Sequence, residues 1–117
     1  MAVTMFGITN CDTIKRAKIW LDDNDIAFAF HDYKKAGVDR RALQAWVDEL
    51  GWEVLLNRAG TTFRGLPDAD KLGIDANKAI ALMIAYPSLI KRPVLDIGER
   101  RIVGFKPETY SDVFGES

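Results

Sequence analysis

The sequence predicts an α/β fold in which two sheet-forming halves flank a helical segment. Two observations carry this prediction: short β-forming apolar stretches occur near both ends of the chain, and apolar residues recur at helical spacing between them. The chain has 117 residues, 48% of them hydrophobic, which suits one domain with a buried core. We therefore expect a single domain over residues 1–117, with a helical insertion at about 39–90.

The first quarter of the chain predicts a strand, a helix and a second strand. Residues 2–8 form a short apolar stretch, and the polar residues 9–13 that follow are typical of a helix start. The helix has one apolar face with helical spacing, made of Ile14, Ala17, Trp20 and Leu21. Phe28 and Phe30 alternate in a second strand over 26–32. These elements form a βαβ unit, which is right-handed by strong precedent.

The middle of the chain predicts helices, and the last quarter predicts a hairpin and a helix. Asp39 and Asp75 are placed as helix N-caps, and a short helical stretch follows Gly65–Pro67. Strands at 94–97 and 101–103 flank a turn, and Pro107 suits the first position of a final helix. The order βαβ, helical insert, ββα is the skeleton of a thioredoxin-like fold.

Composition excludes several classes of protein. A net charge of -1 argues against a nucleic-acid binder, and the single Cys excludes an internal disulfide or a Cys-based metal cluster. The longest apolar run, residues 79–86, is too short to span a bilayer, and the N-terminus lacks the pattern of a signal peptide. We expect a cytoplasmic protein with no metal, no membrane and no nucleic-acid partner.

Cys11 is the first candidate for chemistry. A lone Cys is most often an inert apolar residue, but Cys11 lies between a strand and a helix start, beside the polar residues Asn10 and Thr13. A helix N-terminus stabilises a thiolate and lowers its pKa. The position three residues on is Ile14, so the chain has no dithiol motif, and the only His, His31, falls on the second strand. We predict a single reactive thiol.

Basic residues supply the second candidate feature. Arg92 and Pro93 open the third strand, and in a thioredoxin-like topology this loop faces the Cys and favours a cis peptide bond. Arg92 can hold a carboxylate or oxyanion bidentately. Residues 91–106 carry five basic side chains against two acidic ones, and Arg58 and Arg64 flank another loop. A solvated surface and an anionic substrate near Cys11 are both open interpretations of this charge.

Four segments, residues 6–17, 57–64, 89–94 and 104–107, together resemble the arsenate reductase (ArsC)-like family of thioredoxin-fold proteins. The YffB-type branch is the most similar, and Spx-type regulators are cousins. The resemblance implies a glutathione-dependent reductase in which Cys11 is the nucleophile and glutathione supplies the second thiol. It implies that Arg58, Arg92 and Lys106 bind the anionic substrate. We expect the site for glutathione and for an anionic or disulfide substrate to include four further residues: Asn10, Thr13, Arg64 and Pro93.

Two departures from the family pattern bear on the substrate. Gly7 stands where arsenate reductases carry a His, and Lys106 stands in place of an Arg. We therefore expect a glutathione-linked thiol reductase rather than efficient reduction of arsenate. Two alternatives remain open: an Spx-like regulator that binds RNA polymerase, which Ile14 disfavours because it replaces the second Cys of the Spx switch, and a non-catalytic thioredoxin-like binding module.

Overall fold

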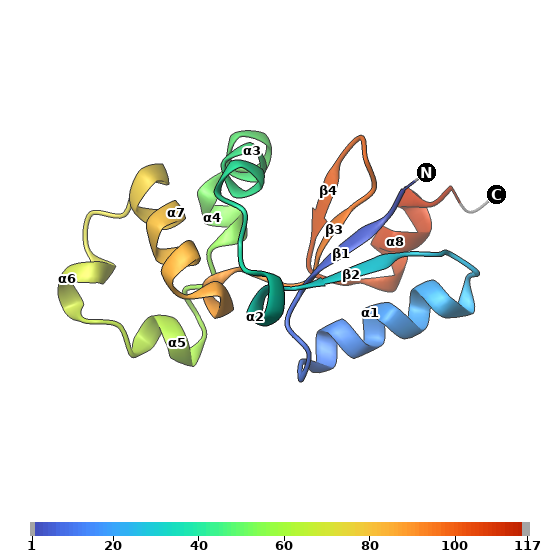
Figure 1. Ribbon diagram of the computed structural model, residues 1–117, viewed down its shortest axis with the longest axis horizontal. Helices are drawn as coiled ribbons and strands as arrows, with labels where there is room; N and C mark the ends of the chain where they lie inside the picture. The colour runs from blue at the N-terminus through green and yellow to red at the C-terminus, as the bar shows by residue number, and fades with distance from the viewer. Residues whose placement is uncertain (1, 116–117) are drawn as a thin grey trace. The chain divides into compact units, whose positions relative to one another are not determined.

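The computed structural model describes residues 2–115 and divides into two compact units (Figure 1). The sheet unit combines the chain up to Asp32 with the chain from Arg92 onward, and the helical unit spans Tyr33–Lys91. The sheet unit is thus built from two segments that are distant in sequence. No helix in residues 2–115 is long and apolar enough to cross a membrane.

The sheet unit contains a four-stranded mixed sheet in the order β2-β1-β3-β4. Its strands are β1 (Thr4–Gly7), β2 (Ala29–Asp32), β3 (Val94–Asp96) and β4 (Arg101–Val103). β2 is parallel to β1, whereas β3 is antiparallel to both β1 and β4. Phe6 pairs with Val94 in this register, so the start of β3 lies beside the end of β1.

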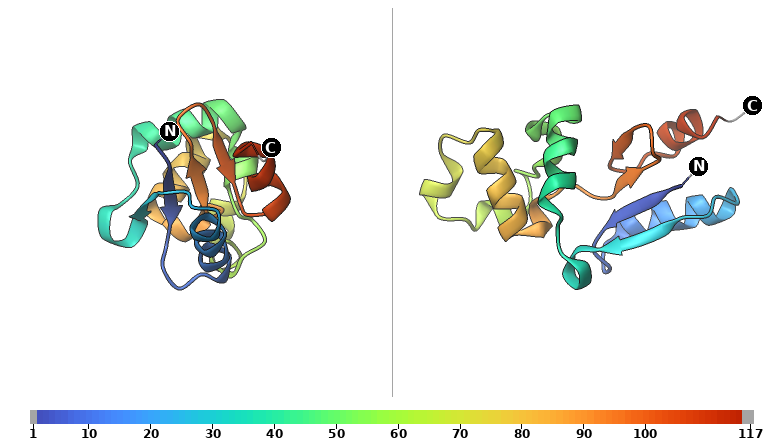
Figure 2. Two further views of the ribbon diagram at one scale, coloured as in Figure 1. Left: turned by 90° about the vertical axis from the view of Figure 1, so that its right-hand side faces the viewer. Right: turned by 45° about the horizontal axis from the view of Figure 1, so that its top comes forward.

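Two helices pack on the apolar residues of this sheet, α1 (Asp12–Asp23) and α8 (Pro107–Val113) (Figures 1 and 2). Ile14, Ala17 and Leu21 of α1 are fully buried or nearly so. Tyr110 of α8 is fully buried, and its ring meets Trp20 edge-on at 5.5 Å between centroids. The core is completed by buried residues of the strands and turns, namely Val3, Met5, Leu95, Ile97 and Ile102.

The helical unit contains six α-helices and one 3-10 helix within Tyr33–Lys91. They are α2 (Tyr33–Ala36), α3 (Arg40–Leu50), α4 (Trp52–Leu55), α5 (Thr61–Arg64), α6 (Asp68–Lys71), α7 (Ala76–Ala85) and η1 (Pro87–Leu89). Asp39 caps α3 by accepting a hydrogen bond from the Arg41 N–H, and Asp75 caps α7 by accepting one from the Lys78 N–H. Both predicted caps are therefore confirmed.

The predicted α/β fold and its element order are confirmed, with shorter strands than expected. The second strand begins at Ala29 rather than at residue 26. The reason is local: the Ile26 N–H donates to the Leu21 carbonyl at 2.9 Å, and Asp25 has a φ of 57°. This backbone therefore belongs to the end of α1 and not to the sheet. The short helices α2, α4 and α5 carry no distinctive apolar period, and the sequence did not predict them.

Candidate active site

Cys11 is the N-cap residue of α1 and comes four residues after the end of β1. Its backbone is extended, with φ of −133° and ψ of 122°, and its carbonyl accepts the Lys15 N–H at 3.0 Å as the first hydrogen bond of the helix. Its side chain is half-buried. The predicted position of Cys11 at a helix start is therefore confirmed, with the thiol partly accessible from solvent.

The surroundings of Cys11 favour the thiolate. Burial alone raises the pKa of the Cys11 thiol, but the Ile14 N–H and the Arg92 guanidinium lower it by more, with a smaller contribution from the Thr13 N–H. The net pKa lies below the ordinary value of a thiol. Amides of the first helical turn and one arginine thus act together on the sulfur. The predicted direction of the pKa shift is confirmed.

Arg92 reaches Cys11 from the segment that begins β3. The peptide bond between Arg92 and Pro93 is cis, as the topology favoured. Pro93 is buried, and its carbonyl accepts the Gly104 N–H at 2.8 Å. This hydrogen bond joins the start of β3 to the loop that follows β4. Gly104 has a φ of 82°, a conformation that glycine adopts without steric cost, and there the chain leaves β4 toward α8.

Gly7, at the end of β1, is closely covered by Ile14 of α1. A Cβ atom at position 7 would lie 2.5 Å from Cδ1 of Ile14 and 3.8 Å from Cβ of Arg92. Ile14 is 1% exposed, so its side chain already fills the space above the end of β1. A side chain at position 7 would therefore require the buried Ile14 side chain to move.

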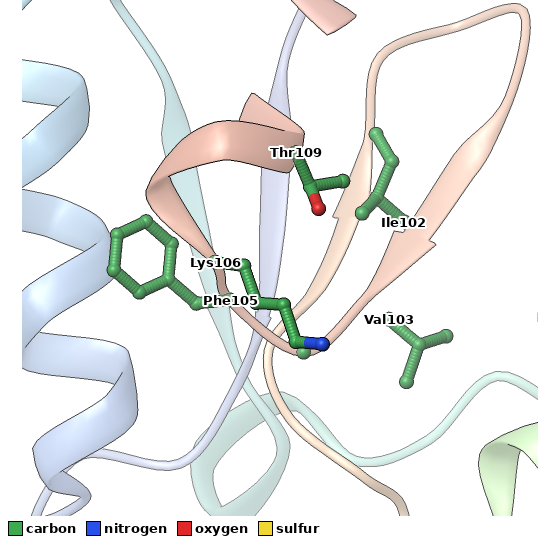
Figure 3. A pocket seen from close by; sticks show the side chains of 6 residues that line it. Ile102, Val103, Phe105, Lys106 and Thr109 are labelled. Atoms are coloured by element: carbon green, nitrogen blue, oxygen red, sulfur yellow. The ribbon is translucent and has the colours of Figure 1, made fainter. Parts of the chain in front are cut away.

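A pocket of about 260 Å³ lies at the end of β4 and the start of α8 (Figure 3). Lys106 and Thr109 provide its polar side chains, and Ile102 and Val103 provide apolar ones. Figure 3 shows the Phe105 ring turned toward α1, in agreement with its packing on the core of the sheet unit. Gly104 belongs both to this pocket and to the hydrogen bond with Pro93. The pocket therefore adjoins the segment that carries Arg92.

The remaining predicted site residues divide between the two units. Asn10 is exposed in the loop before Cys11. Arg58 and Arg64 belong to the helical unit, where both are exposed and Arg58 lies over the Trp52 ring at 5.4 Å. His31 lies on the edge strand β2, with its ring 5.0 Å from that of Phe6. Within residues 2–115 no three His, Cys, Asp or Glu side chains are grouped as metal ligands.

Sequence reasoning missed two parts of this site. It noted the free amides of a helix start, but not that the side chain of Ile14 packs against Gly7. It also took Lys106 from a family resemblance without the pocket that Thr109 and Val103 help to form. Both features depend on contacts between elements. The sequence of residues 104–107, which is part of the family resemblance, was the local indication of the second feature, the pocket at Lys106.

Comparisons with known proteins agree on one family. A model of the ArsC family matches residues 6–113. The solved structure of a protein described as YFFB (PA3664) is 53% identical, with a TM-score of 0.93 over 95% of this chain and 97% of that chain. A solved arsenate reductase (ArsC) related protein from Brucella melitensis is 51% identical, with a TM-score of 0.78 over 98% of this chain and 96% of that chain.

Relatives found by sequence extend this picture. An uncharacterized protein of Haemophilus influenzae is 37% identical over 96% of this chain and 98% of its own length. The global transcriptional regulator Spx of Streptococcus pneumoniae is more distant, at 26% identity over 91% of this chain and 80% of its own length. The family match takes in Cys11, Arg92 and Lys106. The chain therefore belongs to the ArsC family, which includes arsenate reductases.

Proposed function

We propose that the protein is a glutathione-dependent thiol–disulfide reductase with Cys11 as its nucleophile. One observation carries the proposal: the only Cys of the sequence has a pKa that is lowered by Arg92 and by the first turn of α1. Ile14 stands three residues on, where a second Cys of a dithiol motif would be. A reactive thiol without a partner in its own chain needs a second thiol from another molecule. We propose that the protein acts in the cytoplasm, where glutathione is the small thiol available for this step.

The reaction has two exchange steps. The Cys11 thiolate attacks the glutathione sulfur of a mixed disulfide, the bond between glutathione and its partner breaks, and the partner leaves as a thiolate. Cys11 is then joined to glutathione by a disulfide. The thiolate of a second glutathione attacks the glutathione sulfur of that disulfide, which releases oxidised glutathione and restores the Cys11 thiolate. Neither step needs a further oxidant or reductant, because each breaks one disulfide bond, forms another and exchanges one thiolate for another.

Binding is assigned to basic and polar side chains of both units. Glutathione carries two carboxylates, which guanidinium and ammonium groups recognise. Arg92 acts on the sulfur, and Lys106 lines the pocket joined to Pro93 through Gly104, which supports assigning these two residues to the carboxylates of glutathione. The proposal also assigns glutathione or an anionic substrate to Asn10, Thr13, Arg58 and Arg64. Arsenate is the weaker substrate candidate, because Gly7 and Lys106 depart from the arsenate reductase pattern.

The test begins with the thiol itself. The protein is incubated with oxidised glutathione and examined by mass spectrometry, and we expect one glutathione adduct that glutathione removes. Turnover is then measured with a mixed disulfide of glutathione and 2-mercaptoethanol. Cys11→Ser should show no adduct and no turnover, and Arg100→Ala, in the exposed hairpin turn, serves as a matched control. Full activity in Cys11→Ser would falsify the proposal.

A second candidate function rests on the match to Spx regulators over 91% of this chain. In that case the protein would bind RNA polymerase rather than turn over a disulfide. Stoichiometric binding to purified RNA polymerase, together with the absence of a glutathione adduct, would favour the regulator. Adduct formation without polymerase binding would favour the reductase.

A further inference from the structure

Gly7 lies between two groups that both contact Cys11. A Cβ atom there would be 2.5 Å from Cδ1 of Ile14, so that the Ile14 side chain would have to move, and 3.8 Å from Cβ of Arg92, which is an ordinary van der Waals distance. The φ of Gly7 is not positive, so its backbone is open to any residue. Glycine is therefore needed at position 7 for space and not for conformation.

The two neighbours of Gly7 are the main stabilisers of the thiolate, Ile14 through its N–H and Arg92 through its guanidinium. Ile14 is 1% exposed, so the residue that supplies this N–H is also anchored in the core through its side chain. The register places Phe6 opposite Val94, which brings the Arg92 segment to the same end of β1. Ile14 and Arg92 thus both lie beside the end of β1.

We propose that Gly7 is a positioning residue for Cys11, because its missing side chain lets Ile14 pack against the end of β1, and Ile14 in turn supplies an N–H to the sulfur. This inference deepens the proposed function and rests on it. The inference also implies that the residues at positions 7 and 14 depend on each other. Cδ1 of Ile14 is the atom that needs the space, so a larger residue at position 7 requires a smaller one at position 14.

The experiment is a double-mutant cycle read out by thiol reactivity. The variants are Gly7→Ala, Ile14→Val and the double variant, and the rate of Cys11 alkylation by iodoacetamide is followed against pH. Gly7→Ala should raise the pKa of the thiol and slow alkylation at neutral pH by about 3- to 10-fold, as expected for half a unit to one unit. Ile14→Val alone should slow alkylation less than Gly7→Ala does, because valine loses only Cδ1 and the rest of the side chain still packs in the core. The double variant should recover most of the rate, because valine lacks Cδ1.

A matched control separates positioning from loss of stability. Ile97→Val removes one methyl group from a buried residue of the same core, past the far end of β3 from Arg92. It should lower stability in urea without moving the pH profile. If Gly7→Ala does not fold, Ile14→Ala takes its place, because it removes the contact with β1 from the other side and should also raise the thiol pKa.

The outcomes are distinct. If Gly7→Ala, or Ile14→Ala in its place, lowers stability and leaves the alkylation profile unchanged, position 7 is merely structural and the inference is overturned. It is also overturned if the profile shifts in Gly7→Ala but Ile14→Val does not restore it. Alkylation needs no glutathione, so the experiment can contradict the glutathione-dependent function without contradicting the positioning role of Gly7. A protein that forms no glutathione adduct but shows the expected cycle would keep the positioning role of Gly7 and lose the reductase.

Discussion

The three longest helices, α1 in the sheet unit and α3 and α7 in the helical unit, start differently, although each has an N-cap residue with extended backbone. In the helical unit, Asp39 and Asp75 cap α3 and α7 with carboxylates that accept backbone N–H groups. In the sheet unit, Cys11 holds the same place on α1 without a regular side-chain cap hydrogen bond. The amides that a carboxylate would satisfy instead stabilise a thiolate. The N-cap position of α1, which ordinarily contributes to stability, is thus occupied by a cysteine, a weaker cap that can react.

The largest effect should come from converting the reactive cap into a structural one. Cys11→Asp places a carboxylate where the amides of Thr13 and Ile14 and the Arg92 guanidinium favour an anion. We expect complete loss of alkylation and glutathione adduct, with a gain in the free energy of unfolding of about 1 kcal/mol, the usual size of an N-cap contribution. Mass spectrometry and urea unfolding measure the two. An unchanged or lowered stability would contradict the view of this site as an anion cap.

A smaller effect should follow from removing the charge that distinguishes Cys11 from an ordinary cap. Arg92→Ala should raise the pKa of Cys11, and each unit lowers the thiolate fraction at neutral pH about tenfold. Arg92→Lys should recover part of the rate, because it keeps the charge but loses the planar fork. The pH profile of alkylation checks both, with Arg100→Ala as the control. If Arg92→Ala keeps the wild-type profile, the amides alone are responsible for the lowered pKa.

The converse change removes one of the carboxylate caps of the helical unit. Asp75→Ala should lower the free energy of unfolding by about 1 kcal/mol, because the Lys78 N–H loses its acceptor. The alkylation profile of Cys11 should stay as it is, and Asp75→Asn should retain most of the stability. Urea unfolding and alkylation measure these two quantities. A shifted Cys11 profile in Asp75→Ala would mean that the two kinds of cap are not independent.

The smallest effect should be a pH dependence of stability that only the thiol cap produces. The pKa of Cys11 is lower in the folded protein than in the unfolded chain, so the folded state is stabilised once the thiol is ionised. This contribution is fully present above the unfolded pKa and is lost as the pH falls through the folded pKa. The difference in Tm between the wild type and Cys11→Ser should therefore grow as pH rises. A difference that is constant with pH would exclude a thiolate cap.

The sequence predicted local features of the site better than contacts between elements. Asp39 and Asp75 were identifiable because an N-cap is defined by a few consecutive residues, and Cys11 was placed by the change from strand to polar loop to helix. Arg92 was reached only through the expected topology, since it lies far from Cys11 in sequence. The contact between Gly7 and Ile14 was not predicted, because it depends on how closely α1 approaches β1. The pocket at Lys106 likewise needed the geometry of β4 and α8.

The split origin of the sheet unit has a consequence during synthesis. All of the helical unit has been made once Lys91 is added, but β1 lacks its antiparallel neighbour until β3 has left the ribosome. Arg92 arrives at that same moment. While the chain is still growing, Cys11 therefore lacks the guanidinium that lowers its pKa, and its thiol keeps the weaker reactivity of an unfolded chain. Because Arg92 lies in the last quarter of the sequence, a chain that stops before it would contain Cys11 without the guanidinium that helps to lower its pKa.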